Sequence, residues 1–175
     1  MHIQDQRSQL DHMLRQTRMN LVNYSQMADT KAHILLSISA VLLSLSMTRL
    51  SEPHFTYSAT ALILFLLITI FFALLTVIGK IKVFNERKHS INDPDYSPLF
   101  FGNFGDVAYD VYAQDFAETM NDSDKTYEIM VKDIYYAGTY LLRTKYKYIR
   151  LAYLYFFAGL ILSTAIYFFQ NIFLF

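Results

Sequence analysis

Two stretches of the sequence carry no charged residue over 25 positions each, and they constrain the fold more than any other feature. They are residues 55–79 and 151–175. Neither contains proline, and neither alternates between apolar and polar residues as a strand does. Because about 20 apolar residues in a helix cross the hydrocarbon core of a bilayer, both stretches predict membrane-spanning helices. A soluble chain of 175 residues is too small to cover two helices that are apolar on every side.

A third apolar stretch, residues 32–48, has 17 residues and one titratable group, His33. It is short for a span and contains several serines, so we expect it to pack against the other two helices. These serines are Ser37, Ser39, Ser44 and Ser46. The predicted fold class is therefore an all-α membrane protein with three transmembrane helices. We place the spans at residues 32–48, 58–79 and 151–174.

The charges outside the spans are unevenly distributed. Fourteen of the 15 Lys and Arg residues lie in segments 1–31 and 80–150, and only Arg49 lies in segment 49–57. The positive-inside rule places the richer side in the cytosol. We therefore expect a cytosolic N-terminus, an external C-terminus and a cytosolic helical insertion between the second and third spans. The formal net charge of zero argues against a general nucleic-acid binder, which carries a basic excess.

Local patterns divide the predicted cytosolic segments into helices and one loop. We expect residues 1–31 to run as a helix into the first span, and residues 80–92 to continue the second. Proline and glycine mark an ordered loop at 96–105. A helix of about 15 residues should follow, capped by Asp106. Ser123 is the predicted cap of a last helix that runs unbroken into the third span, roughly 50 residues in all.

The sequence carries no recognisable catalytic motif, so we predict that the protein is not an enzyme and has no catalytic residues. It has no cysteine, and its five histidines are scattered. Asp29 and His33 are four residues apart and either form a proton pair or mark a polar entry to the membrane. A row of carboxylates, at Asp106, Asp110, Asp115, Glu118 and Asp122, fits a solvated helix face better than a divalent-metal site. We predict no metal.

Two short segments are unusual for their position. Residues 27–32 (MADTKA) place Asp29 and Lys31 at the mouth of the first span, where charges are costly unless solvated or paired. Residues 98–102 (PLFFG) place apolar bulk in a predicted cytosolic loop. The first segment fits a polar membrane boundary, and the second fits a loop packed on the helices. They also fit a small-molecule pocket in which aromatic rings stack a base and backbone N–H groups meet a phosphate.

These segments, with the later DIY and LLRTKYKYIRLAY stretches that enter the third span, resemble the transmembrane effectors of Pycsar anti-phage systems. The resemblance extends from about residue 9 to the end of the chain. It implies an effector of abortive infection in the bacterial inner membrane. The resemblance also implies that a partner pyrimidine cyclase makes cCMP or cUMP on infection, and that the effector senses this nucleotide and impairs the membrane.

We hypothesise that the ligand contacts residues in or near the matching motifs. A homo-oligomer is expected, because one three-helix protomer encloses no wide pore, and no cofactor beyond the cyclic nucleotide is implied. The alternative function is a membrane-anchored adaptor whose cytosolic helices bind a protein partner. The candidate ligand-binding residues are Asp29, Lys31, Phe100, Phe101, Gly102, Asn103, Asp133 and Lys145.

Overall fold

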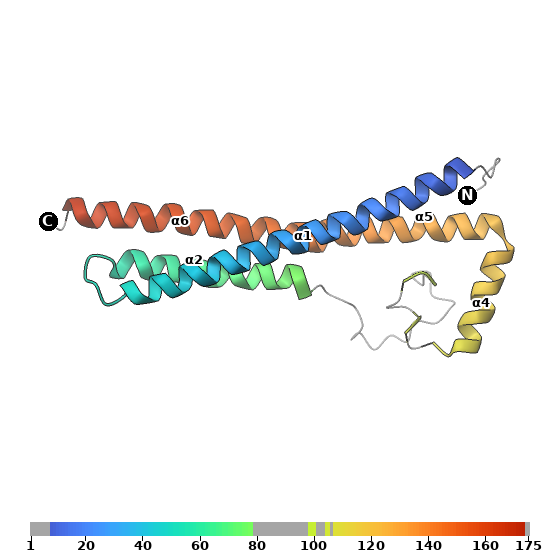
Figure 1. Ribbon diagram of the computed structural model, residues 1–175, viewed down its shortest axis with the longest axis horizontal. Helices are drawn as coiled ribbons and strands as arrows, with labels where there is room; N and C mark the ends of the chain where they lie inside the picture. The colour runs from blue at the N-terminus through green and yellow to red at the C-terminus, as the bar shows by residue number, and fades with distance from the viewer. Residues whose placement is uncertain (1–7, 79–97, 101–103, 106, 174–175) are drawn as a thin grey trace. The chain divides into compact units, whose positions relative to one another are not determined.

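The structure is a computed structural model, and it describes residues 8–78, 98–100, 104–105 and 107–173. Its elements are all helical, and the described residues contain no strand, which confirms the predicted all-α class. In chain order they are α1 (Ser8–Arg49), α2 (Thr56–Ile78), α4 (Tyr109–Asn121), α5 (Ser123–Tyr140), the π-helix η2 (Leu141–Tyr146) and α6 (Lys147–Phe173) (Figure 1).

Three helices are long and apolar enough to cross a membrane, as predicted. They are Ser8–Arg49, Thr56–Ile78 and Ser123–Ile172, the last comprising α5, η2 and most of α6. The first confirms that the N-terminal helix continues into the first span from Ser8 onward. The third confirms an unbroken helix of 50 residues. The helix expected at 80–92 lies outside the described residues.

The caps around α4 and α5 differ from the prediction. Asp122 has an extended backbone, and its carboxylate accepts hydrogen bonds from the backbone N–H groups of Asp124 at 3.0 Å and Lys125 at 3.2 Å. The prediction of Ser123 as the cap is therefore wrong, since Ser123 is already the first helical residue. Helix α4 begins at Tyr109, and its N-cap residue Ala108 makes no side-chain cap hydrogen bond. Asp106 lies outside the described residues.

Replacing Asp122 with alanine tests this assignment. The substitution removes the acceptor of two backbone N–H groups, so we expect a loss of about 1 kcal/mol in the free energy of unfolding. Asp122→Asn is the matched control, because asparagine caps helices as well as aspartate does. Thermal unfolding of the detergent-solubilised protein measures both variants, and equal melting temperatures for Asp122→Ala and the wild type would contradict the assignment.

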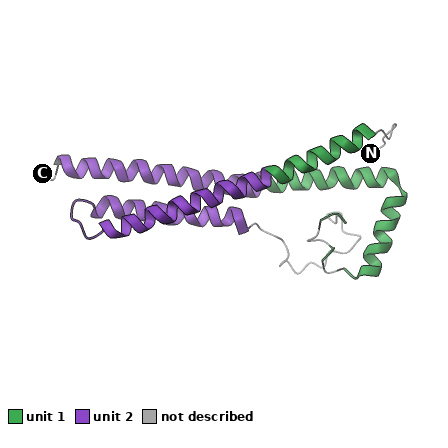
Figure 2. Ribbon diagram, in the orientation of Figure 1, with its two compact units in different colours: residues 1–23, 80–141 green, residues 24–79, 142–175 purple. Residues whose placement is uncertain are grey.

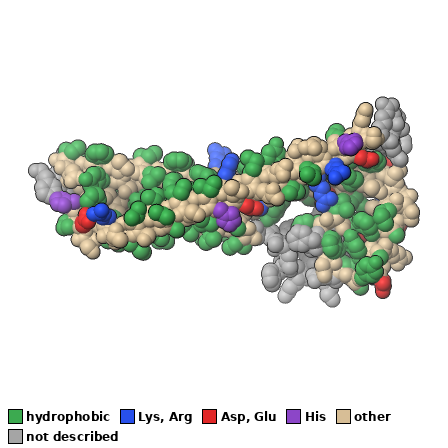
Figure 3. Space-filling view, viewed as in Figure 1, with side chains coloured by type: hydrophobic (Ala, Val, Ile, Leu, Met, Phe, Trp, Pro, Cys, Tyr) green, Lys and Arg blue, Asp and Glu red, His purple; other side chains and the backbone are tan. Residues whose placement is uncertain are grey.

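The chain divides into two compact units, residues 1–23 with 80–141 and residues 24–79 with 142–175 (Figure 2). The second unit contains all of α2 and α6 and the larger part of α1. Its visible surface is mainly hydrophobic, with charged side chains gathered toward its two ends (Figure 3). That distribution is the one expected of helices that lie among lipid tails.

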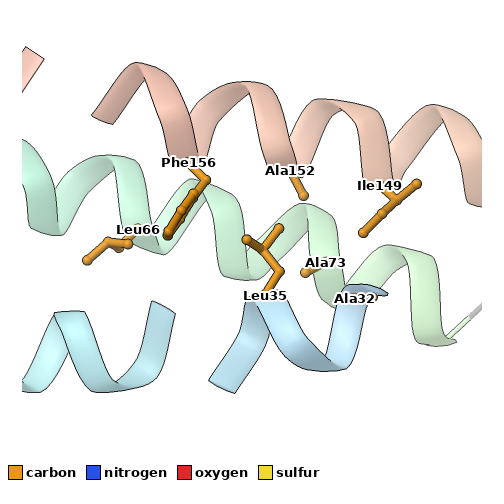
Figure 4. Close-up of a cluster of buried hydrophobic side chains, with 7 residues drawn as sticks. All are labelled: Ala32, Leu35, Leu66, Ala73, Ile149, Ala152 and Phe156. Carbon is orange, nitrogen blue, oxygen red and sulfur yellow. The ribbon is translucent and has the colours of Figure 1, made fainter. Parts of the chain in front are cut away.

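The core of the second unit lies between three helices (Figure 4). Three of its seven buried residues are alanines with no exposed surface, one from each helix, and such small residues let helix backbones approach closely in a membrane. The seven are Ala32 and Leu35 of α1, Leu66 and Ala73 of α2, and Ile149, Ala152 and Phe156 of α6.

Hydroxyl groups of the second unit are only partly turned inward. Thr69 and Thr76 of α2 are fully buried and donate to carbonyls four residues earlier in their own helix. The first span packs against the other two helices, as predicted, but only two of its four serines are buried. Ser39 and Ser46 are buried, whereas Ser37 and Ser44 are exposed.

Helices α2 and α6 run antiparallel in close contact. Phe55, the residue before α2, stacks on Tyr167 near the end of α6, with ring centroids 5.0 Å apart. Further along α2, Phe72 stacks on Tyr155 at 5.4 Å. Between these rings, the Ser163 hydroxyl donates to the Ser58 carbonyl at 2.9 Å. Aromatic stacking and one hydrogen bond thus fix the register of the pair.

Candidate functional site

A largely buried ion pair joins α1 to η2 in the second unit. The Lys145 ammonium lies 2.7 and 2.6 Å from the two carboxylate oxygens of Asp29, and 2.8 Å from the hydroxyl oxygen of Ser25. The Lys145 side chain is 12% exposed and that of Asp29 is 32% exposed. Ser25 and Asp29 are one helical turn apart on α1, so both face the same ammonium.

This geometry matches the hydrogen-bonding capacity of the groups. A lysine ammonium has three N–H donors, and three oxygen acceptors surround Lys145. A charge taken out of water is costly unless it is paired and hydrogen-bonded, and here it is both. The Lys145 ammonium is therefore held at a defined position, and the anion bound to it is the Asp29 carboxylate.

Lys145 belongs to a π-helix, which the sequence analysis did not predict. Helix η2 spans six residues, Leu141–Tyr146, between two α-helices. π-Helical turns are rare and occur frequently at functional sites. No sequence pattern would have revealed the turn, since η2 contains neither glycine nor proline. Ser25 was also missed, although its position four residues before Asp29 could have indicated it.

The structure brings together only Asp29 and Lys145 of the candidate ligand residues that it describes within the second unit. Lys31 lies on α1 and is exposed. In the first unit, Phe100 is 43% exposed. Asp133 is buried in α5, with Oδ2 3.4 Å from Nε of Arg18 on α1. Phe101, Gly102 and Asn103 lie outside the described residues, so the predicted role of this loop stays a prediction.

Other polar contacts of the first unit join α1 to α5 and the loop to α4. The Tyr127 hydroxyl donates to Asp11 at 2.6 Å. Further along both helices, Asp133 contacts Arg18. Since both residue numbers rise together along these contacts, α1 and α5 run parallel here. The Tyr112 hydroxyl donates to the Pro98 carbonyl at 3.2 Å, and its ring contacts Phe116.

Two carboxylates in or next to α4 have structural partners. Glu118 pairs with Lys125 at 2.6 Å, and Asp122 caps α5. Burial raises the pKa of the Asp115 carboxyl, the neighbouring Glu118 raises it further, and Lys125 lowers it. Among the residues that the structure describes, no group of three or more His, Asp or Glu could hold a metal ion.

A shallow hollow on α6 is apolar. It has a volume of about 400 Å³ and contains none of the candidate ligand residues. Its lining is Leu160, Ile161, Thr164, Ala165 and Phe168. This lining suits a lipid tail or a neighbouring helix better than a charged nucleotide.

Most of the chain matches a known protein family. Residues 12–170 match the family model described as the Pycsar effector protein domain. No curated protein and no solved structure matches the chain. The matched residues include Asp29, Lys145 and Ser25, together with most of the three helices that could cross a membrane.

Proposed function

The chain belongs to the Pycsar effector protein domain family, and from this premise we propose that it is a membrane effector of anti-phage defence activated by a cyclic pyrimidine nucleotide. The observation that carries the proposal is the extent of the match. One family model covers residues 12–170, which contain all of α2 and most of the other two helices able to span a membrane.

The activating ligand is cCMP or cUMP, supplied by a partner cyclase after infection. The protein catalyses no reaction in this proposal. Ligand binding shifts an equilibrium between a resting and a membrane-impairing state, and the size of the shift is set by the difference in affinity for the two states. Loss of inner-membrane integrity then stops the cell before the phage completes its cycle, which is abortive infection.

The proposed topology has three spans, with the N-terminus in the cytosol and the C-terminus outside. It rests on the 14 basic residues in segments 1–31 and 80–150. A nucleotide made in the cytosol then meets residues of those segments. We propose that the effector is a homo-oligomer, because three helices of one protomer do not enclose a wide pore, and that it binds no nucleic acid.

Reconstitution tests this function directly. Purified protein in liposomes of bacterial lipids, loaded with a self-quenched dye, is mixed with cCMP, cUMP or cAMP. We expect dye release or membrane depolarisation with a cyclic pyrimidine nucleotide and none with cAMP. In cells, co-expression with the cyclase and phage challenge should depolarise the membrane, and a catalytically dead cyclase should not.

Two results would contradict the proposal. One is an intact membrane in the presence of either cyclic pyrimidine nucleotide, with a protein that binds neither in calorimetry. The other is a stoichiometric protein partner that co-purifies in the absence of nucleotide and remains bound in its presence, which would favour the adaptor.

A further inference from the structure

The donors of the Lys145 ammonium form a binding place for an anion. The ammonium is largely buried, its donors converge on one carboxylate and one hydroxyl, and the carboxylate comes from a different helix. Exposed cations flank it along the chain, at Arg143 in η2 and at Lys147 and Arg150 in α6. Basic side chains this close along the chain favour small anions near this stretch of the helix.

We propose that Lys145 binds the phosphate of the activating ligand, and that the Asp29 carboxylate takes the place of this phosphate in the resting state. The inference rests on the proposed function, because it takes the ligand to be a cyclic nucleotide. Asp29 then acts as a tethered competitor, and activation is the exchange of one anion for another on the same ammonium.

The exchange is chemically balanced. An Asp carboxylate and a cyclic phosphodiester each carry one negative charge, and each presents two terminal oxygens to hydrogen-bond donors. Lys145 therefore stays paired throughout, which avoids the penalty of leaving a buried charge alone. The Ser25 hydroxyl, now 2.8 Å from the Lys145 ammonium, can also donate to a phosphate oxygen. Ser25 is thus part of the phosphate site.

The exchange also releases a mechanical constraint. Asp29 and Ser25 are the side chains of α1 that hold Lys145 of η2. Once Asp29 is displaced, η2 is free to return to the more common α-helical hydrogen bonding, in which each residue pairs four positions away instead of five. The released carboxylate has a new partner within reach, since His33 lies four residues further along α1.

Substitutions at the two charged positions test the inference in the liposome assay. Asp29→Asn removes the competing charge and keeps the shape of the side chain. We expect liposomes with this variant to leak without nucleotide. They should respond at a nucleotide concentration at least roughly tenfold lower than the wild type needs, because the loss of one charged contact changes an affinity by about that factor. Lys145→Met breaks the same contact, so it should also leak without nucleotide, and nucleotide should not change its leak. The charge-swapped double variant, Asp29→Lys with Lys145→Asp, should be quiet without nucleotide.

The controls separate this mechanism from misfolding and from failure of the proposed function. Glu52→Gln breaks the exposed ion pair with Arg49, 2.6 Å long, and should behave as the wild type. Calorimetry of Asp29→Asn gives a second readout, and tighter binding than the wild type is expected. A wild type that responds to nucleotide, with an Asp29→Asn variant of unchanged affinity and no leak, would overturn the inference alone. An unresponsive wild type would overturn the proposed function.

Discussion

Replacing Gly159 with alanine is expected to destabilise the contact between α2 and α6, whereas the same change at Gly138 is not. A Cβ atom at Gly159 would lie 2.5 Å from the Cβ of Phe65 and 3.1 Å from its Cγ. Neither atom is the far end of a flexible side chain, so one of the two helices has to shift. Overpacking of this kind costs about 1–3 kcal/mol.

The bilayer makes this cost harder to offset. Lipid tails are as apolar as the helix surfaces, so helix association depends on close van der Waals packing. We expect the melting temperature of Gly159→Ala, measured in detergent, to fall by about 2–12 °C. The register contacts on either side of Gly159, such as the stacking of Phe72 on Tyr155, should loosen with it.

Gly138→Ala is a matched control because it makes the identical chemical change in another helix interior. A Cβ there would lie 3.7 Å from Cδ2 of Leu21, an ordinary contact. Since alanine favours a helix by roughly 0.5–1 kcal/mol over glycine, this variant should be neutral or more stable. Equal losses of stability in the two variants would show that close packing is not the reason for Gly159.

Breaking the pair between Asp29 and Lys145 is the second large effect that we expect. Lys145→Met leaves a carboxylate without its partner, and Asp29→Leu leaves an ammonium that is 12% exposed. Removing one partner of a fully buried pair costs about 3–5 kcal/mol. Because Asp29 is 32% exposed, we expect each single variant to lose about 1–3 kcal/mol.

A double-mutant cycle isolates the interaction. The double variant, with Asp29→Leu and Lys145→Met, has no unpaired charge and should lose less than the two single variants together, by roughly 0.5–3 kcal/mol. The exposed pair of Arg49 with Glu52 provides the comparison, and substituted likewise it should show a coupling of about 0.2–1 kcal/mol. Denaturation in mixed micelles measures all the variants. Additive losses at Asp29 and Lys145 would contradict the assigned contact.

Predictions from the sequence succeeded where the composition of one segment decides its structure. The absence of charge over 25 positions predicted α2 and α6 to within a few residues. They failed where two neighbours compete for one role. Asp122 and Ser123 both suit an N-cap, and the backbone conformation at Asp122, with φ −118° and ψ 107°, decides between them.

The candidate site shows the same division. Asp29 was recognised as an unusual charge at the mouth of the first span, and both Asp29 and Lys145 were candidate ligand residues that the family match covers. Their pairing could not be read from the sequence, because 116 residues separate them. The buried position of Ser39 and the exposed position of Ser37 also depend on which side of α1 meets the other helices.

By itself the sequence determined that this chain has three helices able to cross a membrane, since a run of about 20 apolar residues is long enough to cross the hydrocarbon core whatever it packs against. Only the tertiary structure decided which side chains meet. The pairing of Lys145 with Asp29 and the contact of Gly159 with Phe65 both depend on how the faces of separate helices are turned toward one another. The rotation of each helix about its axis is set by the packing of all the side chains between the helices at once.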